Sequence, residues 1–138
     1  MSPSTVKLTM PAKAEYLILA RLALTGISRE VPMTEAVLAD LKLAVTEACG
    51  NAVRHAYAAD RGVVRVVFEV EPEEIEIRVE DEGSGVPGPR PDTELSEEEA
   101  DLAESGMGLA IIRAIMDEFE VEGRGDGAGT LVRMRKRL

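Results

Sequence analysis

Two short segments with alternating apolar and polar residues, joined by a four-residue turn, constrain the fold of this chain most strongly. The segments cover residues 64–70 and 75–79, and Glu71–Glu74 forms the turn between them. Their alternating apolar positions are Val64, Val66, Phe68, Val70, Ile75, Ile77 and Val79. Period-two alternation indicates strands with one buried and one solvated face. The other elements must therefore supply a layer that covers the buried face of this hairpin.

The residues before the hairpin predict one more strand and two helices. Residues 5–10 alternate and predict a strand. Pro11 suits the first turn of a helix that ends at about Thr25, before a glycine. Thr34 is expected to cap a second helix, which begins at the next residue and runs to about Tyr57.

The first of these helices is apolar on almost all sides between Tyr16 and Leu24, with Arg21 as the one charge. A helix with one solvated face would not have this composition. Two alternatives follow. Either the fold buries this helix on two sides, or one side meets another protein.

The residues after the hairpin predict a long loop, a third helix and two closing strands. Residues 83–106 are rich in Gly, Pro and Ser and then acidic, which is typical of a long loop that is either functional or disordered. The helix is expected at 107–117, and the strands at 119–122 and 130–136. The order predicts a single α+β domain over residues 1–138. It is a two-layer sandwich whose mixed, mainly antiparallel sheet is covered on one face by three helices.

Composition narrows the class of partner. The formal net charge is −10, from 26 acidic and 16 basic residues, so direct nucleic-acid binding is not expected. No apolar run is long enough to span a membrane, and a lone cysteine, Cys49, fits a reducing cytoplasm. We therefore expect a cytoplasmic protein with protein partners.

A polar stripe on the second helix is the first candidate site. Glu47, Asn51 and His55 are spaced four residues apart and share one face. A solvated face would explain the stripe equally well, but Ala48, Gly50 and Ala52 leave room beside it. Glu47 and Asn51 could both ligate Mg²⁺, or one could hold the metal while the other accepts a proton. His55 fits a structural role better than a catalytic one.

The end of the hairpin is the second candidate site. Asp81 continues the inward series of its strand, so its carboxylate is expected on the buried face. Such a group needs a donor, either the exocyclic amine of a nucleobase or N–H groups of the following turn. Gly83 and Gly85 would permit close approach of a ligand. An ordinary Asp-Gly turn is the alternative interpretation.

Glycines before the third helix form the third candidate site. The exposed N–H groups of a helix that begins at Ser105-Gly106-Met107-Gly108 would suit phosphate, although the Walker-type Lys-Ser is missing. Thr130, at the start of the last strand, shares the inward parity of its neighbours and would face the same interior region as Asp81.

In this order the three sites resemble the motifs of the GHKL (Bergerat-fold) ATP-binding superfamily. Residues 47–57 are similar to its N-box, 81–85 to its first glycine box and 105–109 to its second. Within the superfamily, the chain most resembles the bacterial anti-sigma-factor serine kinases of sporulation and general stress. Similar stretches include Met10-Pro11-Ala12 and Met116-Asp117-Glu118.

The resemblance implies a role for each matching residue, with ATP and Mg²⁺ as cofactors. Glu47 would be the general base that takes the proton from the attacking serine, and Asn51 would ligate Mg²⁺. Asp81 would accept from the adenine amine, with Thr130 beside it. Residues 86–105 would form a lid over the nucleotide. The remaining nucleotide-binding positions would be Gly83, Gly85, Gly106, Met107, Gly108 and Leu109.

The resemblance also implies a function. The protein would hold a sigma factor inactive and phosphorylate a serine of a STAS-type anti-anti-sigma protein, and it would form a homodimer. Two alternatives stay open: a nucleotide-gated binding module without useful phosphotransfer, and a kinase of a STAS scaffold that binds no sigma factor. Gly50, where many relatives have Thr, and Glu104, where some have Arg, would mark the binding module.

Overall fold

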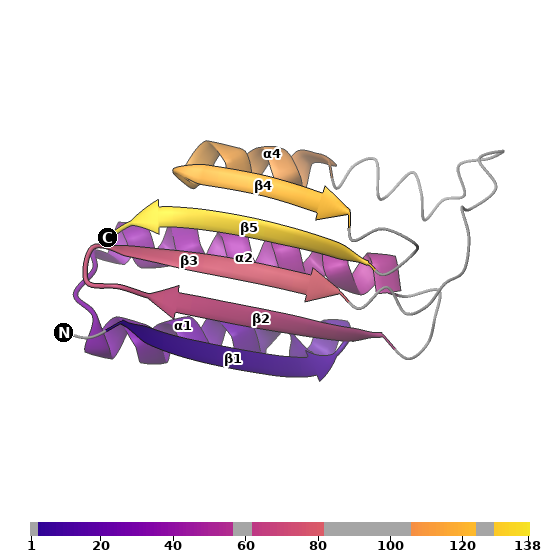
Figure 1. Cartoon of the computed structure of the whole chain (residues 1–138), viewed down its shortest axis with the longest axis horizontal. Helices are drawn as coiled ribbons and strands as arrows, with labels where there is room; N and C mark the ends of the chain where they lie inside the picture. The colour runs from indigo at the N-terminus through magenta and orange to yellow at the C-terminus, as the bar shows by residue number, and fades with distance from the viewer. Residues whose placement is uncertain (1–2, 57–61, 82–105, 124–128) are drawn as a thin grey trace, which may run out of the picture.

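The computed structural model describes residues 3–56, 62–81, 106–123 and 129–138. These residues form a five-stranded sheet, and the helices lie together on one of its faces (Figure 1). The strands are β1 (Ser4–Pro11), β2 (Val63–Val70), β3 (Glu74–Asp81), β4 (Glu118–Gly123) and β5 (Thr130–Arg137). The helices are η1 (Ala14–Tyr16, a 3₁₀ turn), α1 (Leu17–Glu30), α2 (Glu35–Ala56) and α4 (Gly106–Ile115).

The strand order is β1-β2-β3-β5-β4, and the four neighbouring pairs are antiparallel. The two-layer α+β sandwich predicted from the sequence is thereby confirmed. β5, the last strand in the chain, lies between β3 and β4. This crossover brings the start of β5 next to the end of β3, which is where two of the candidate sites were expected.

The start of the chain differs from the sequence prediction in two places. Pro11 ends β1, where it is paired with Val63, instead of opening the first helix. The first helix does not stop at Thr25 but runs through Gly26 to Glu30. A Cβ at Gly26 would meet nothing within 4 Å, so this glycine lies on an open helix surface and does not form a cap.

The second helix begins where the sequence predicted. The backbone N–H of Val37 donates to Thr34 Oγ1 at 3.1 Å, which is the expected N-cap bond. The helix is described as far as Ala56, and Tyr57 lies outside the described residues.

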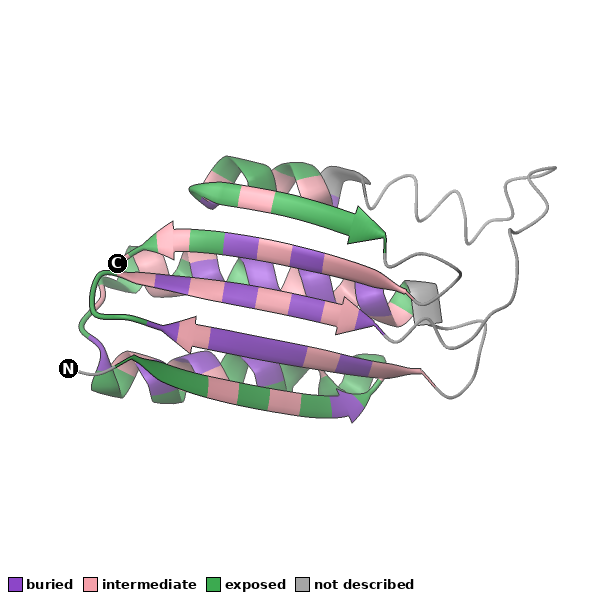
Figure 2. Cartoon of the chain, viewed as in Figure 1, coloured by how far each residue is buried: buried purple, intermediate pink, exposed green. Residues whose placement is uncertain are grey.

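The core lies between the sheet and the helices, and the inward residues of β2 and β3 are its centre (Figure 2). The largest fully buried side chains include Phe68, Leu24, Leu41, Ile75, Ile77, Ile112 and Met134. The apolar alternation of the hairpin is therefore the buried face of the sheet, as predicted. The fold does not bury α1 on two sides, which was the first alternative for this helix. One side of α1 packs on α2, but Ile18 and Leu22 on its outer side are each 56% exposed.

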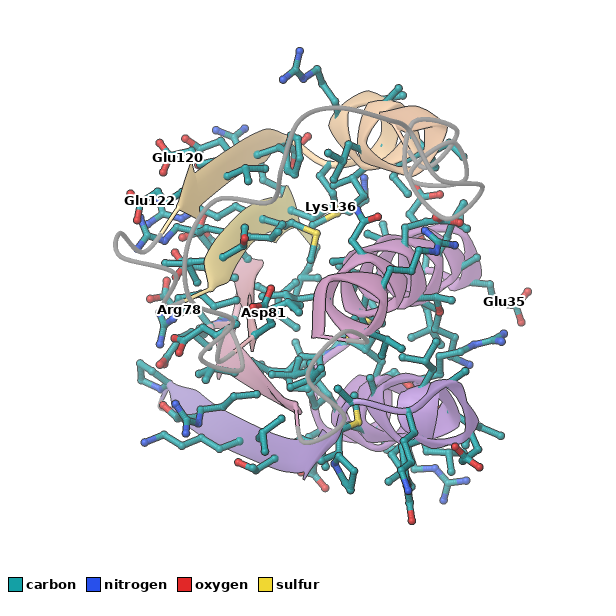
Figure 3. The ribbon with its side chains drawn as sticks, turned by 90° about the vertical axis from the view of Figure 1, so that its right-hand side faces the viewer. Glu35, Arg78, Asp81, Glu120, Glu122 and Lys136 are labelled. Atoms are coloured by element: carbon teal, nitrogen blue, oxygen red, sulfur yellow. The ribbon has the colours of Figure 1, made fainter. Side chains whose placement is uncertain are left out.

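The sheet face away from the helices carries charged side chains, and Arg78, Glu120 and Glu122 point from it in Figure 3. Glu76 is at the centre of this face, with its side chain 13% exposed. It lies 2.8 Å from Arg135 and 2.8 Å from Arg78. Burial acts to raise the pKa of the Glu76 carboxyl, but the hydrogen bonds and charges of these two arginines outweigh it and hold that pKa below its ordinary value.

Candidate active site

A small pocket lies at the end of the core where β3 ends and β5 begins. Its volume is about 30 Å³, which is too small to enclose a nucleotide, since small-molecule pockets span roughly 300–1,000 Å³. We treat it as the inner end of a site. Side chains from two helices and three strands line it: Ala48, Asn51, Ala52, Val79, Asp81, Leu109, Val121, Thr130 and Val132.

The pocket brings together two polar residues that are far apart in the sequence. Asp81 is the last residue of β3 and is 2% exposed, so its inward orientation, predicted from strand parity, is confirmed. In Figure 3 its side chain points into the space between the sheet and the helices. Thr130, the first residue of β5, lines the same pocket and is half-buried. A carboxylate and a hydroxyl thus face a largely apolar recess, which is suitable for the polar edge of a flat heterocycle.

The polar stripe of α2 borders this pocket. Asn51 lies in the pocket wall and is 6% exposed, and Glu47, one turn earlier, is half-buried. Arg54 Nη1 donates to Asn51 Oδ1 at 3.4 Å. The stripe is therefore not a fully solvated face. The side chain of His55 lies outside the described residues.

The Glu47 carboxylate touches the first turns of α4. A Cβ built on Gly108 would lie 2.5 Å from Glu47 Oε2 and 3.5 Å from its Cδ. Any side chain at position 108 would thus occupy the space that the carboxylate fills. Glycine is required here for close approach of the carboxylate and not for an unusual backbone angle.

α4 begins at Gly106, so its first backbone N–H groups have no partner within the helix. Such a helix start is a favourable place for an anion. The structure therefore places a carboxylate from α2 and the positive end of a helix dipole side by side. The side chain of Met107, both Gly83 and Gly85, and the proposed lid at 86–105 lie outside the described residues.

Reasoning from the sequence missed Val121 as a residue of this pocket. It faces inward on β4 and is paired with Val132, yet it is 47% exposed. Its inward parity was available from the predicted strand at 119–122. The signal for the pocket was missing, because the sequence does not show that β5 pairs with β3 and so brings β4 to this end of the core.

A cysteine nucleophile and a metal site made of several side chains both find no support in the described residues. Cys49 is fully buried, and burial raises the pKa of its thiol to about 12, so it is a packing residue and not a nucleophile. The described part of the chain holds no group of three or more His, Cys, Asp or Glu residues that could bind a metal ion. Mg²⁺ in nucleotide sites commonly takes phosphate oxygens as ligands.

The described residues also contain no helix with the length and apolar character needed to cross a lipid bilayer.

Comparison with known proteins places these features in a family. Residues 10–136 match the family described as "Histidine kinase-like ATPase domain". The chain is 35% identical over 139 residues to the serine-protein kinase RsbW of Bacillus subtilis, covering 96% of this chain and 85% of that protein. It is 32% identical over 124 residues to RsbW of Bacillus cereus, covering 84% of this chain and 76% of the relative.

A solved structure has the same fold. The crystal structure of the RsbU and RsbW domains of a Mycobacterium tuberculosis protein matches with a TM-score of 0.72 at 22% sequence identity. The match covers 98% of this chain and 32% of that longer chain.

Proposed function

The chain belongs to the histidine kinase-like ATPase domain family, and from that premise we propose that it is an ATP-dependent protein serine kinase and an anti-sigma factor. It holds a sigma factor inactive and phosphorylates a serine of a STAS-type anti-anti-sigma protein. Similarity to RsbW serine-protein kinases over most of the chain supports this assignment. Because a sigma factor works in the cytoplasm, we place the protein there.

The observation that supports catalysis best is the close approach of Glu47 to Gly108. A Cβ built on Gly108 would lie only 2.5 Å from the carboxylate oxygen of Glu47. A phosphate held by the N–H groups of α4 lies next to a carboxylate that can accept a proton. A binding module without phosphotransfer would need the helix start but not the carboxylate beside it.

The pocket residues bind the base of ATP. Asp81 is an acceptor for the exocyclic amine of adenine, and Thr130 lines the same pocket. The apolar wall from Val79, Leu109 and Val121 covers the ring. With the base in this pocket, the triphosphate extends toward the start of α4.

Mg²⁺ fits the donors present, with Asn51 Oδ1 as the protein ligand and the remaining ligands from phosphate and water; it would neutralise charge on the phosphates. For Asn51 Oδ1 to bind a cation, the Arg54 guanidinium, now 3.4 Å from it, must move away.

Phosphotransfer then needs one proton acceptor. The serine Oγ of the substrate protein attacks the γ-phosphorus, the bond to the bridging oxygen of ADP breaks, and Glu47 takes the hydroxyl proton. The N–H groups at the start of α4 stabilise the charge on the phosphoryl oxygens.

The experiment is incubation of the protein with γ-labelled ATP, Mg²⁺ and STAS proteins encoded near it, with Ser→Ala forms of those proteins as controls. Label on a serine of one STAS protein is the expected result. ATP binding without any transfer would favour the nucleotide-gated binding module. Transfer without capture of any sigma factor would favour the kinase of a STAS scaffold.

A homodimer through α1 is part of the same proposal. Ile18 and Leu22 are each 56% exposed on the outer side of α1, and Leu19 is 38% exposed. A cluster of exposed large apolar side chains is typical of an interaction surface. Arg21, also exposed, would lie at the rim. Light scattering at micromolar concentration, with and without ATP, tests this: a dimer that Leu22→Asp converts to a monomer supports it, and a monomeric wild-type mass contradicts it.

A further inference from the structure

Lys136 lies on the inner side of the sheet and reaches two helices at once. It is opposite Ile75 in the register of β5 and β3, in the same parity as the buried Met134 and Val132. Its side chain is 13% exposed. In Figure 3 it lies between β5 and the helices. A lysine on this face is unusual, because the neighbouring inward positions are apolar.

The ammonium of Lys136 has one partner on each helix. Nζ donates to the backbone carbonyl of Ile115, the last residue of α4, at 2.5 Å. It is also 3.5 Å from Asp40 Oδ2 on α2. A cation at a helix C-terminus satisfies a carbonyl that the helix leaves unbonded and interacts favourably with the helix dipole. Lys136 thus joins the end of α4 to α2.

The two contacts of Lys136 lie at the same spacing, along both helices, from the contact between Glu47 and Gly108. Asp40 and Glu47 are seven residues apart on α2, and Ile115 and Gly108 are seven residues apart on α4. Seven residues are two helical turns, or about 10 Å along the axis, and return to nearly the same face. Within the packed interface of α2 and α4, the contact of Asp40 with Ile115 through Lys136 and the contact of Glu47 with Gly108 thus lie about two turns apart.

Two hydrogen bonds just after α4 join the chain to β5 and not to α2. The backbone N–H of Asp117 donates to the carbonyl of Arg135 at 2.9 Å, and the N–H of Arg137 donates to Asp117 Oδ2 at 2.7 Å. These bonds hold the turn after α4 to β5. Loss of the Asp117 side chain would loosen this turn but leave the bridge from α4 to α2 in place.

We propose that Lys136 is a positioning residue for phosphotransfer, which sets the axial position of α4 along α2 and thereby the place of the Glu47 carboxylate relative to the N–H groups that hold the phosphate. The proposal rests on the proposed function of Glu47 as general base. Because both helices are stiff over two turns, a shift at the Lys136 end is transmitted to the Gly108 end.

The test compares Lys136→Met, which keeps the length of the side chain but removes its charge, with Lys136→Arg and Asp117→Ala. We expect Lys136→Met to lower kcat for phosphotransfer about tenfold, because misplacement of a reacting group by a fraction of an ångström has effects of this order. The Kd for ATP, measured by calorimetry, should change less than about threefold, because the N–H groups of α4 move together with the phosphate. Lys136→Arg should restore most of kcat, and Asp117→Ala should leave kcat within twofold.

The same substitution made in the Glu47→Gln protein separates this proposal from the proposed function. If Lys136 acts through Glu47, then Lys136→Met should have almost no effect on the residual rate of Glu47→Gln. Equal tenfold losses in both backgrounds would overturn the positioning role, as would a Lys136→Met enzyme with wild-type kcat or an Asp117→Ala enzyme with the same loss. A Glu47→Gln enzyme with the wild-type rate would instead overturn the general base. Thermal unfolding of each variant gives the temperature below which all of them are folded for the assay.

Discussion

Gly108→Ala is the substitution whose effect follows most directly from the structure. The new methyl carbon would lie 2.5 Å from Glu47 Oε2, whereas ordinary contact begins near 3.4 Å. The difference, 3.4 − 2.5, means that the carboxylate must retreat by about 1 Å. The obstructing atom is the far end of a flexible side chain, so the protein can make this change without unfolding.

The expected magnitude is large for activity and small for stability. Displacement of a reacting group by about 1 Å can cost about 10²-fold in rate, so we expect kcat to fall by that order. Alanine also improves the helix by up to about 1 kcal/mol relative to glycine, which offsets the cost of moving Glu47. The free energy of unfolding should therefore change by less than about 1 kcal/mol.

Gly50→Ala is the matched control. Gly50 lies on α2 three residues after Glu47, and a Cβ there would meet nothing within 4 Å. This variant should keep the wild-type kcat and be more stable by up to about 1 kcal/mol. The assay is transfer of labelled phosphate at saturating ATP, beside urea unfolding of both variants. A folded Gly108→Ala enzyme with the rate of Gly50→Ala would refute the argument that Glu47 must touch position 108.

Three further predictions concern binding and stability. Asp81→Asn presents a donor where the adenine amine also donates, and such a mismatch in a buried contact costs about 1–3 kcal/mol. ATP binding, measured by calorimetric titration, should therefore weaken ten- to a hundredfold. Unchanged affinity would contradict the assignment of Asp81 to the base site. Glu76→Gln should lower the free energy of unfolding by about 1 kcal/mol at neutral pH, because the carboxylate loses its charge interaction with two arginines. Since the pKa of Glu76 is lowered in the folded state, this advantage is present above the ordinary glutamate value of about 4.3 and is lost as the pH falls below it, so urea titrations of the two proteins should converge in acid. Thr34→Ala removes the bond to the N–H of Val37 and should cost about 1 kcal/mol in the same assay; no change would mean that the cap bond adds nothing.

The sequence predicted the elements whose pattern is local. Alternation in residues 64–79 identified the β2–β3 hairpin and its buried face, and Thr34 identified the start of α2. The inward orientation of Asp81 followed from counting residues along one strand. These features depend on neighbours within a few residues, which a single sequence displays.

Features that depend on contacts between distant residues were not predictable in this way. Gly26 looked like a helix end, but packing of Leu24 and Ile27 in the core carries α1 past it. Val121 lines the pocket only because β5 lies between β3 and β4. The contact of Glu47 with Gly108 joins positions 61 residues apart (108 − 47) and has no signature in either local motif.

Glu47→Gln tests the central claim most directly, because it keeps the shape and hydrogen bonding of the side chain while it removes the base. The measurement is transfer of the γ-phosphate of labelled ATP to a STAS-protein serine, with ATP affinity determined on the same preparation by calorimetry. The account predicts a rate lower by roughly 10²–10⁴-fold, with ATP bound as tightly as by the wild-type protein. Full transfer by Glu47→Gln would contradict the general-base role, and with it the interpretation of the carboxylate beside the start of α4.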